Sequence, residues 1–252
     1  ISSASEILSQ LPLLINPNSK EKIILISTEF PAITYPWIAY SKKINLNLIF
    51  VKEKKKQNLT DQIIKNIDET TAAVCVSFVQ FSSGTRLDIV KLRTATEKMG
   101  VKLIVDITQA AGVIPLSVET WRADLVVCSG YKWLGGHGGV AFAIFSEELL
   151  KKQPPTIGWF GVKDPFEMTA TKLSLAQSAA KYTQSTLSYI SVIGLNTAID
   201  NLLTISIQKI FDHSERLANV LVSELNGLSW DPLHEPGTTE FSPHIISLYS
   251  SK

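Results

Sequence analysis

Short, nearly continuous runs of apolar residues alternate with longer helical patterns over residues 1–145, and this alternation constrains the fold more than any other feature of the sequence. The runs are rich in β-branched residues, and they do not alternate between apolar and polar positions. Such runs are typical of strands that are covered on both faces. Alternating strands and helices favour an α/β fold with a mostly parallel central sheet and helices on both faces. The predicted strands are 23–28, 46–51, 72–78, 101–107, 123–129 and 139–145.

The character of the chain changes after the sixth predicted strand. Residues 151–185 are rich in Pro and Gly and are predicted to form loops, and two long helical patterns follow them. We expect a large domain over residues 1–205 and the start of a small C-terminal α+β domain over 206–252, which closes with a strand at 244–250. The predicted helices are 4–14, 33–42, 59–69, 87–99, 187–203 and 206–226.

The two ends of the chain look like cuts in a longer sequence. The chain begins at Ile1 rather than at Met, and it stops at Lys252 directly after an apolar run. We therefore expect the N-terminal part of the large domain, and the rest of the small domain, to lie outside this chain.

Charge and composition exclude several classes of function. The 24 Lys and Arg residues nearly balance the 23 Asp and Glu residues, so the net charge of +1 leaves no electrostatic footprint for a nucleic acid. No run of about 18 apolar residues is present, so we expect no membrane partner. Two cysteines in apolar runs are too few for a disulfide framework or a cysteine-rich metal site. These features predict a cytoplasmic protein without a metal.

Polar residues that can do chemistry follow two neighbouring predicted strands. Asp106 closes one strand, Gln109 stands three residues later, and Lys132 follows the next strand. Ligands of parallel sheets bind at the carboxyl ends of the strands. The pKa of a lysine falls on burial, which suits this side chain to Schiff-base chemistry. An Asp nearby can pair with a protonated pyridine nitrogen, which pyridoxal phosphate (PLP) needs in order to act as an electron sink.

A resemblance to a known family lies in residues 105–145, which read VDITQAAGVIPLSVETWRADLVVCSGYKWLGGHGGVAFAIF. This stretch resembles the cofactor core of the class V aminotransferase-like PLP enzymes, which include cysteine desulfurases, selenocysteine lyases, kynureninases and isopenicillin N epimerase-like proteins. The specific motif is D-x-x-Q followed by S-G-(H/Y)-K, and the resemblance extends from Ser2 to about residue 250. It implies the PLP-dependent transferase fold type I, PLP as cofactor, and a homodimer with shared active sites.

The resemblance also implies roles for the residues of the motif. Lys132 looks like the lysine that forms the aldimine with PLP and later shuttles the Cα proton. Asp106 looks like the partner of the pyridinium nitrogen, and Gln109 sits where the family places a donor to the phenolic oxygen. Ser129 and Tyr131 match the residues that hold the phosphate.

Further cofactor contacts are implied outside the motif. Ala4 and Ser5, in S-A-S-E, resemble the turn at a helix start that cradles the phosphate, although Ser5 would otherwise be an ordinary N-cap. Phe30 matches the aromatic residue that stacks on the pyridine ring, and its alternative is plain core packing. Thr186 resembles the residue that reaches across the dimer interface to the neighbour's phosphate, with Ser185 as the next choice. The alternative role for this polar cluster is a helix cap.

Two departures leave the reaction open. Phe81 stands where desulfurase-like members usually carry Asn, and the Arg for the substrate carboxylate and the desulfurase Cys would lie beyond Lys252. The resemblance implies transamination or lyase chemistry on an amino-acid-like amine, through a carbanion at Cα. Cysteine desulfurase, selenocysteine lyase or kynureninase-type cleavage is the alternative within the family. An inactive member of the fold, or an α/β binding protein, is the alternative of another class.

A third alternative is a dinucleotide-binding oxidoreductase. The glycine run 135–139 nominally fits the dinucleotide fingerprint, but it opens a predicted strand rather than a helix. The sequence therefore disfavours this alternative.

Overall fold

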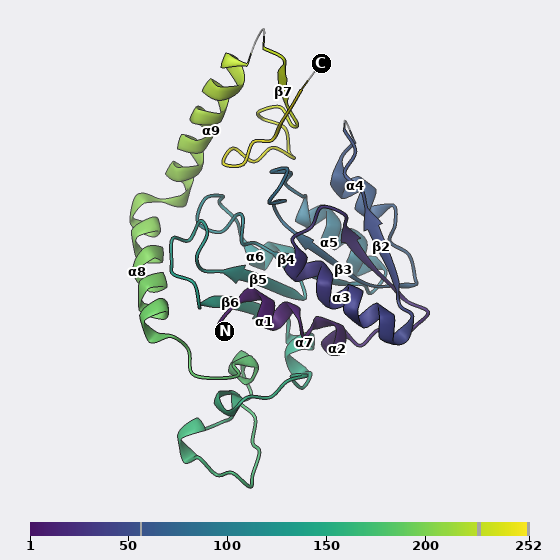
Figure 1. Ribbon diagram of the computed structural model, residues 1–252, viewed down its shortest axis with the longest axis vertical. Helices are drawn as coiled ribbons and strands as arrows, with labels where there is room; N and C mark the ends of the chain where they lie inside the picture. Colours follow the sequence, from purple (N-terminus) through teal and green to yellow (C-terminus); the bar gives the residue numbers. More distant parts are fainter. Residues whose placement is uncertain (56, 226–227, 251–252) are drawn as a thin grey trace.

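A six-stranded sheet forms the centre of the computed structural model, which describes residues 1–55, 57–225 and 228–250 (Figure 1). The strand order is β2-β1-β3-β4-β5-β6, and only β6 runs antiparallel to its neighbour. The prediction of a mostly parallel sheet is therefore confirmed. The strands are β1 (Lys22–Ile26), β2 (Asn47–Val51), β3 (Thr71–Ser77), β4 (Lys102–Asp106), β5 (Leu125–Ser129) and β6 (Ala141–Phe145).

Helices cover both faces of this sheet, as predicted. Alternate residues of β1 divide between two apolar layers, because successive side chains of a strand point to opposite faces. One layer packs against α1 (Ala4–Leu8), α2 (Leu11–Ile15), α3 (Pro31–Ile44) and α7 (Glu147–Lys151). The other layer packs against α4 (Leu59–Ile64), α5 (Ile89–Lys98), α6 (Val118–Trp121) and α8 (Tyr189–Ile205).

The N-terminal helix differs from the prediction. The single helix expected over residues 4–14 is divided into α1 and α2, with Ser9 and Gln10 between them. Pro12 explains the break, because it has no N–H to donate to the carbonyl of Leu8 and its ring collides with that carbonyl in a continuous helix. The division leaves α1 as a short separate helix that begins at Ala4.

The C-terminal region also differs from the prediction. The helix α9 (Ile207–Glu224) leads from α8 to a small sheet of two strands, β7 (Trp230–Pro232) and β8 (Leu248–Ser250) (Figure 1). The strand β8 is shorter than the strand expected over 244–250. Residues 239–247 instead lie against the large sheet's rim. The N–H of Arg86 donates to the carbonyl of Glu240 at 2.8 Å, and the hydroxyl of Ser247 donates to the carbonyl of Ser82 at 2.7 Å.

The predicted loop region contains three short 3₁₀ turns, at Trp159–Gly161, Pro165–Glu167 and Ala179–Tyr182. Within the described ranges, no single helix is long and apolar enough to cross a membrane. The helices α8 and α9 meet that test of length and composition only as a pair, which is bent by 72°.

The register of the parallel strands places three polar residues at one edge. Ser77 at the end of β3 pairs with Asp106 at the end of β4, and β5 extends two residues past the partner of Asp106 to reach Ser129. The carboxyl ends of β3, β4 and β5 therefore meet, and this is where a ligand of such a sheet is expected.

Candidate functional site

A cavity of about 140 Å³ opens at the carboxyl ends of β3, β4 and β5. The start of α1 and the junction between β1 and α3 complete its wall. Eight of the nine residues predicted to contact a cofactor line this one cavity, although they come from four separate segments of the chain. The lining residues are Ser3, Ala4, Ser5, Phe30, Ala32, Ser77, Phe81, Asp106, Thr108, Gln109, Ser129, Tyr131 and Lys132.

Asp106 forms the buried floor of the cavity. Only 6% of the residue is exposed, and one of its carboxylate oxygens, Oδ1, accepts a hydrogen bond from the N–H of Thr108 at 2.7 Å. Burial, with a smaller contribution from the charge of Glu29 nearby, raises the pKa of this carboxyl to about 6, although hydrogen bonds from Thr108 act in the opposite direction. A buried carboxylate with few donors favours a positively charged or proton-bearing partner in the cavity.

Glu29 is a second buried carboxylate, which the sequence did not single out. Its oxygens accept hydrogen bonds from the N–H and the hydroxyl of Ser77, from the side-chain amide of Gln80 and from the N–H of Phe30. Burial raises the pKa of Glu29 above its ordinary value. Its position directly before Phe30, after an apolar strand, is the only sequence signal that pointed to it.

Lys132 lies at the rim of the cavity rather than in its floor. Its side chain is exposed, and Nζ stands 5.4 Å from the centre of the Tyr131 ring. The chain turns sharply behind it, since the N–H of Gly136 donates to the carbonyl of Gly130 at 2.9 Å. A Cβ on Gly136 would meet that carbonyl oxygen at 2.9 Å, so this turn requires a residue without a side chain. The turn presents Lys132 to the cavity.

The start of α1 and the end of β5 form the polar end of the cavity. Ser3 is the N-cap of α1, because its side chain accepts from the N–H of Glu6 at 3.3 Å, and the alternative that Ser5 is the cap is therefore wrong. Ala4 and Ser5 lie in the first turn, whose N–H groups have no partner within a helix. The N–H of Ser129 donates to the hydroxyl of Thr108 at 3.0 Å. This arrangement suits an anion.

Two aromatic rings form the apolar wall. Phe30 is 44% exposed, so the alternative that it packs in the core is wrong. Phe81 stands edge-to-face with it, with ring centres 5.5 Å apart. The departure noted at position 81 therefore replaces a polar contact by a second aromatic ring in the cavity. Of the lining residues, sequence reasoning gave no role to Ser3, Ala32, Ser77 and Thr108.

Thr186 is the one predicted cofactor residue that lies outside this cavity. It is exposed in the loop before α8. The helix is capped by Ser188, whose side chain accepts from the N–H of Ser191, so Thr186 is not the cap. A role in a neighbouring subunit's site stays a prediction.

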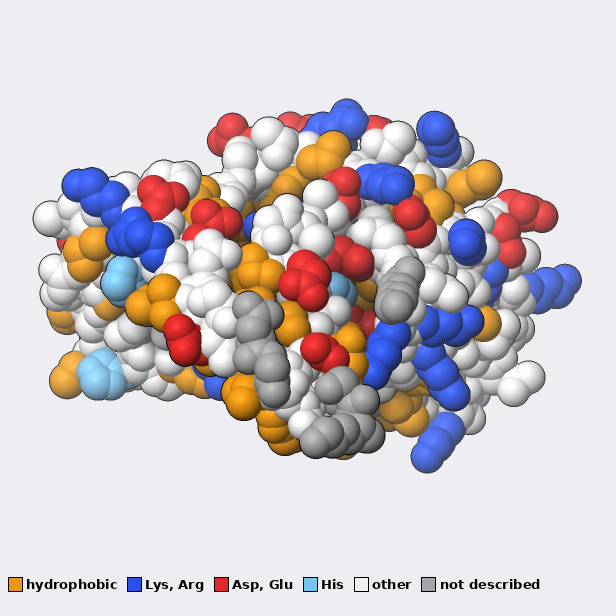
Figure 2. All heavy atoms as spheres, turned by 90° about the horizontal axis from the view of Figure 1, so that it is seen from above, with side chains coloured by type: hydrophobic (Ala, Val, Ile, Leu, Met, Phe, Trp, Pro, Cys, Tyr) orange, Lys and Arg blue, Asp and Glu red, His pale blue; other side chains and the backbone are white. Residues whose placement is uncertain are grey.

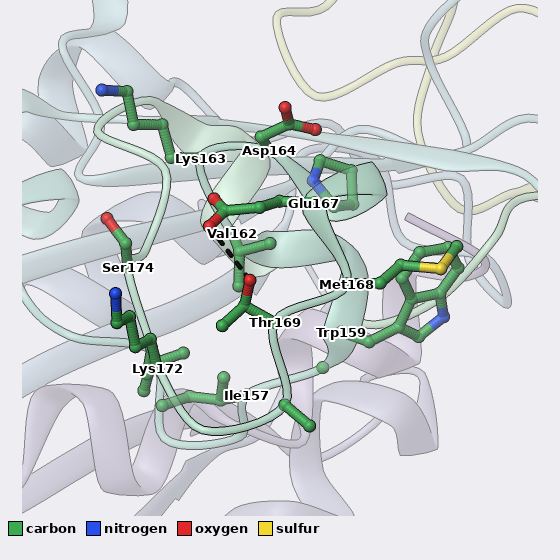
Figure 3. Close-up of a pocket in the computed structure, with 14 residues that line it drawn as sticks. Ile157, Trp159, Val162, Lys163, Asp164, Glu167, Met168, Thr169, Lys172 and Ser174 are labelled. Atoms are coloured by element: carbon green, nitrogen blue, oxygen red, sulfur yellow. Dashed lines mark hydrogen bonds between the residues drawn. The ribbon is translucent and has the colours of Figure 1, made fainter.

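A larger concavity of about 980 Å³ lies elsewhere, within the single segment 157–174 (Figure 3). Figure 3 shows Lys163 and Asp164 directed away from its centre, and a side-chain hydrogen bond that joins Thr169 to Glu167 at 3.0 Å. It lacks the buried carboxylates and the strand ends that surround the smaller cavity. We therefore take the smaller cavity as the candidate active site.

The face of the molecule that Figure 2 shows carries acidic, basic and apolar side chains together. Basic side chains are most numerous on the right of that view but also stand at its left end, and acidic ones are spread between them. This distribution agrees with the nearly balanced charge of the sequence.

Comparison of the whole fold with solved structures defines its class. An apo cysteine desulfurase from Thermococcus onnurineus superposes with a TM-score of 0.87 over 98% of this chain and 62% of that one, at 22% identity. The chain therefore has the α/β fold of the cysteine desulfurases, and the predicted fold class is confirmed.

The sequence places the chain within that class. It belongs to the aminotransferase class-V family, whose model matches residues 2–248. An uncharacterized aminotransferase of Bacillus subtilis, YcbU, is 27% identical over 84% of this chain and 56% of its own length. A kynureninase of Yarrowia lipolytica is 28% identical over 88% of this chain and 54% of its own length. The chain thus spans about half the length of the curated relatives it matches.

Proposed function

We propose that this chain is the cofactor-binding part of a PLP-dependent enzyme that acts on an amino-acid-like primary amine. The observation that carries the proposal is the convergence of Asp106, Gln109, Ser129 and Lys132 with the start of α1 around one cavity. Membership of the class V family supports the same cofactor. The reaction is transamination or lyase chemistry.

The residues of the cavity fit this cofactor. The raised pKa of Asp106 suits a carboxylate that shares a proton with a pyridine nitrogen. The exposed ring of Phe30 offers an apolar face to a flat heterocycle. The first turn of α1, with Ser129 and Tyr131, offers donors to a phosphate.

Each side chain then has a task in the reaction. PLP, when bound, supplies an electron sink for the electrons of a bond broken at the substrate Cα. The Nζ of Lys132 would hold the cofactor and would move the proton at the substrate Cα. Asp106 would hold a proton on the ring nitrogen, and Phe30 with Phe81 would cover one side of the bound ring.

Two further candidates share these residues. Cysteine desulfurase, selenocysteine lyase or kynureninase-type cleavage of a C–S or C–C bond would use the same Lys132 and Asp106. Phe81 stands where desulfurase-like members usually carry Asn, so this cavity departs from the desulfurase pattern at that position. A member of the fold that binds ligand without turnover is the candidate of another class.

The assembly and the domain division belong to the same proposal. The exposure of Thr186 outside its own cavity supports a homodimer in which each subunit completes the other's phosphate site. The bend at Ser206, whose φ is 81°, supports a boundary between a large domain over 1–205 and a small one from 206. Two buried, unpaired cysteines, Cys75 and Cys128, support a reducing, cytoplasmic setting.

The test is covalent trapping of the cofactor. The protein is loaded with PLP, reduced with borohydride and digested, and the labelled peptide is mapped. We expect a visible absorption band before reduction and a label on Lys132, both lost in Lys132→Ala. Lys163→Ala, at an exposed lysine outside the cavity, is the control and should keep both. A label on another lysine would contradict the assignment of Lys132, and no bound PLP would contradict the function.

A further inference from the structure

The side chain of Gln109 is held by a residue that the proposed reaction does not use. The indole Nε1–H of Trp133 donates a hydrogen bond to Oε1 of Gln109 at 2.9 Å. An indole nitrogen can only donate, so the atom of the amide that faces Trp133 must be the oxygen. The NH₂ group of Gln109, which carries both donors of the amide, is therefore left for the cavity.

The backbone of Gln109 is held from the other side by His244. The Nε2 of His244 lies 2.6 Å from the carbonyl oxygen of Gln109. A carbonyl can only accept, so Nε2 carries the proton of the neutral ring. Burial lowers the pKa of His244 to about 4, which keeps the ring neutral. The ring also stands edge-to-face with Trp133, with centres 4.7 Å apart.

Gly112 brings the two turns into contact. It has a φ of +99°, and a Cβ there would lie 2.5 Å from the carbonyl oxygen of Trp133. The backbone that follows Gln109 therefore packs directly against the backbone that follows Lys132. This close approach fixes the distance across which the indole reaches Gln109.

His244 belongs to the C-terminal segment 239–247, which is attached to the same rim. Gly84 allows this contact, because a Cβ there would lie 1.9 Å from the carbonyl oxygen of Ile245. The hydroxyl of Ser247 donates to the carbonyl of Ser82. The segment therefore contacts both Ser82, which follows Phe81 of the cavity wall, and Gln109.

We propose that Trp133 and His244 are positioning residues, which together orient Gln109 so that its NH₂ group donates to the phenolic oxygen of PLP. His244 thereby couples the placement of the C-terminal segment to the cofactor site. This inference rests on the proposed function, because it needs a bound PLP for its effect.

The orientation has a spectroscopic consequence. A donor to the phenolic oxygen stabilises the negative charge on that oxygen and weakens its hold on the proton of the neighbouring imine nitrogen. Loss of the donor should therefore raise the apparent pKa read from the pH titration of the bound cofactor's visible band. Gln109→Leu should raise it by about one pH unit, which is tenfold in the proton-binding constant.

The test applies this titration to variants of the positioning residues. Trp133→Phe keeps an aromatic ring against His244 but removes the N–H, and it should raise the apparent pKa by about half a unit or more. His244→Phe should move it in the same direction. Neither substitution should have a further effect in the Gln109→Leu background, because both act through Gln109. Trp230→Phe, at an exposed Trp in β7, is the control and should leave the titration unchanged.

A measurement without cofactor separates the two proposals. The indole N–H resonance of Trp133, assigned by its loss in Trp133→Phe, should shift in apo Gln109→Leu and stay in place in apo Trp230→Phe. Wild-type protein that binds no PLP would contradict the proposed function. Wild-type protein that binds PLP, with a titration unchanged in Trp133→Phe and His244→Phe, would overturn the positioning inference alone. An unshifted indole resonance in Gln109→Leu would also overturn it.

Discussion

The carboxylate of Glu29 accepts both hydrogen bonds that Ser77 can donate, from its N–H at 2.8 Å and from its hydroxyl at 2.5 Å. The same carboxylate accepts from the N–H of Phe30 at 2.9 Å and from Gln80 at 3.0 Å. One buried side chain therefore joins the loop after β1 to the end of β3. It also fixes the backbone of the aromatic residue in the cavity wall.

Glu29→Ala should destabilise the protein strongly, because it leaves buried donors of Ser77 and Gln80 without an acceptor. Each unsatisfied buried donor costs about 1–3 kcal/mol, so we expect the free energy of unfolding to fall by roughly 3 kcal/mol. Glu97→Ala removes an exposed carboxylate paired with Arg122 and should cost less than about 1 kcal/mol. Urea unfolding of both variants measures this difference. Equal losses would show that the Glu29 hydrogen bonds add nothing.

Asp106 should make the cofactor-free protein less stable as the pH rises. The pKa of the folded state is about 6, against an ordinary value of 3.8, so the folded protein holds this proton more tightly than the unfolded chain. Its stabilising effect is therefore complete below pH 3.8 and is lost as the pH rises to about 6. Asp106→Asn should be more stable than wild type at pH 7, by up to about 3 kcal/mol, and should have no such advantage at pH 4. Denaturant midpoints at the two pH values decide this, and a constant difference between them would contradict it.

His244 should contribute a pH dependence of the opposite sign. Its pKa is lowered from 6.5 to about 4, so the folded protein binds this proton less tightly than the unfolded chain. Stability from this residue is present above pH 6.5 and is lost as the pH falls toward 4. The two effects overlap and partly cancel in wild type. His244→Gln should therefore show the fall in stability with rising pH that Asp106 produces, and the same denaturant midpoints should reveal it. A pH profile like that of wild type would show that His244 is not held neutral by burial.

The fold was predictable because elements that are buried in the core consist mostly of apolar residues. The strands β3 and β5 are buried along nearly their whole length, so they read as continuous apolar runs. Because Asp106 and Ser129 end two of the predicted strands, their place at the carboxyl edge of the sheet could be predicted without knowledge of any contact. The single helix predicted over residues 4–14 was wrong at Ser9 and Gln10, and the rule that a Pro such as Pro12 interrupts a helix within the preceding turn could have predicted this break.

The contacts that support the site could not be read from local patterns. Glu29 lies 48 residues from Ser77, and His244 lies 135 residues from Gln109. Periodicity predicts which face of an element is buried, but it does not say which distant polar group will meet another there. The hydrogen bond from Trp133 to Gln109 could not be predicted either, because it depends on the close approach of the two turns at Gly112.

The close approach at Gly112 gives a matched pair of variants. Gly112 and Gly100 both have positive φ, +99° and +67°, but a Cβ on Gly100 would meet nothing within 4 Å. Gly100→Ala should therefore cost only the backbone strain, about 1–2 kcal/mol. Gly112→Ala adds a collision with the Trp133 carbonyl and should cost about 2 kcal/mol more, as overpacking does. Urea unfolding compares them, and a Gly112→Ala variant no less stable than Gly100→Ala would show that the two turns are not in fixed contact.

Thr186 gives the most direct test of shared active sites. If it completes the neighbour's phosphate site, Thr186→Ala should weaken PLP binding about tenfold through loss of one hydrogen bond to a charged group. A subunit with Lys132→Ala still carries Thr186, and a subunit with Thr186→Ala still carries Lys132. A mixed dimer of these two subunits therefore contains one complete site and one that lacks both groups.

Co-expression of the two variants under different tags, with purification of the mixed dimer, isolates that complete site. We expect borohydride to trap PLP in the mixed dimer at about half the wild-type amount, at cofactor concentrations too low to label the Thr186→Ala homodimer. The Lys132→Ala homodimer should trap none. A pair of Lys132→Ala and Lys163→Ala subunits is the control for mixing itself, since Lys163 is exposed and lies outside the cavity. Labelling of the Thr186→Ala homodimer as strong as that of wild type would show that Thr186 does not reach a neighbour's site, because each cavity would then be complete within its own subunit.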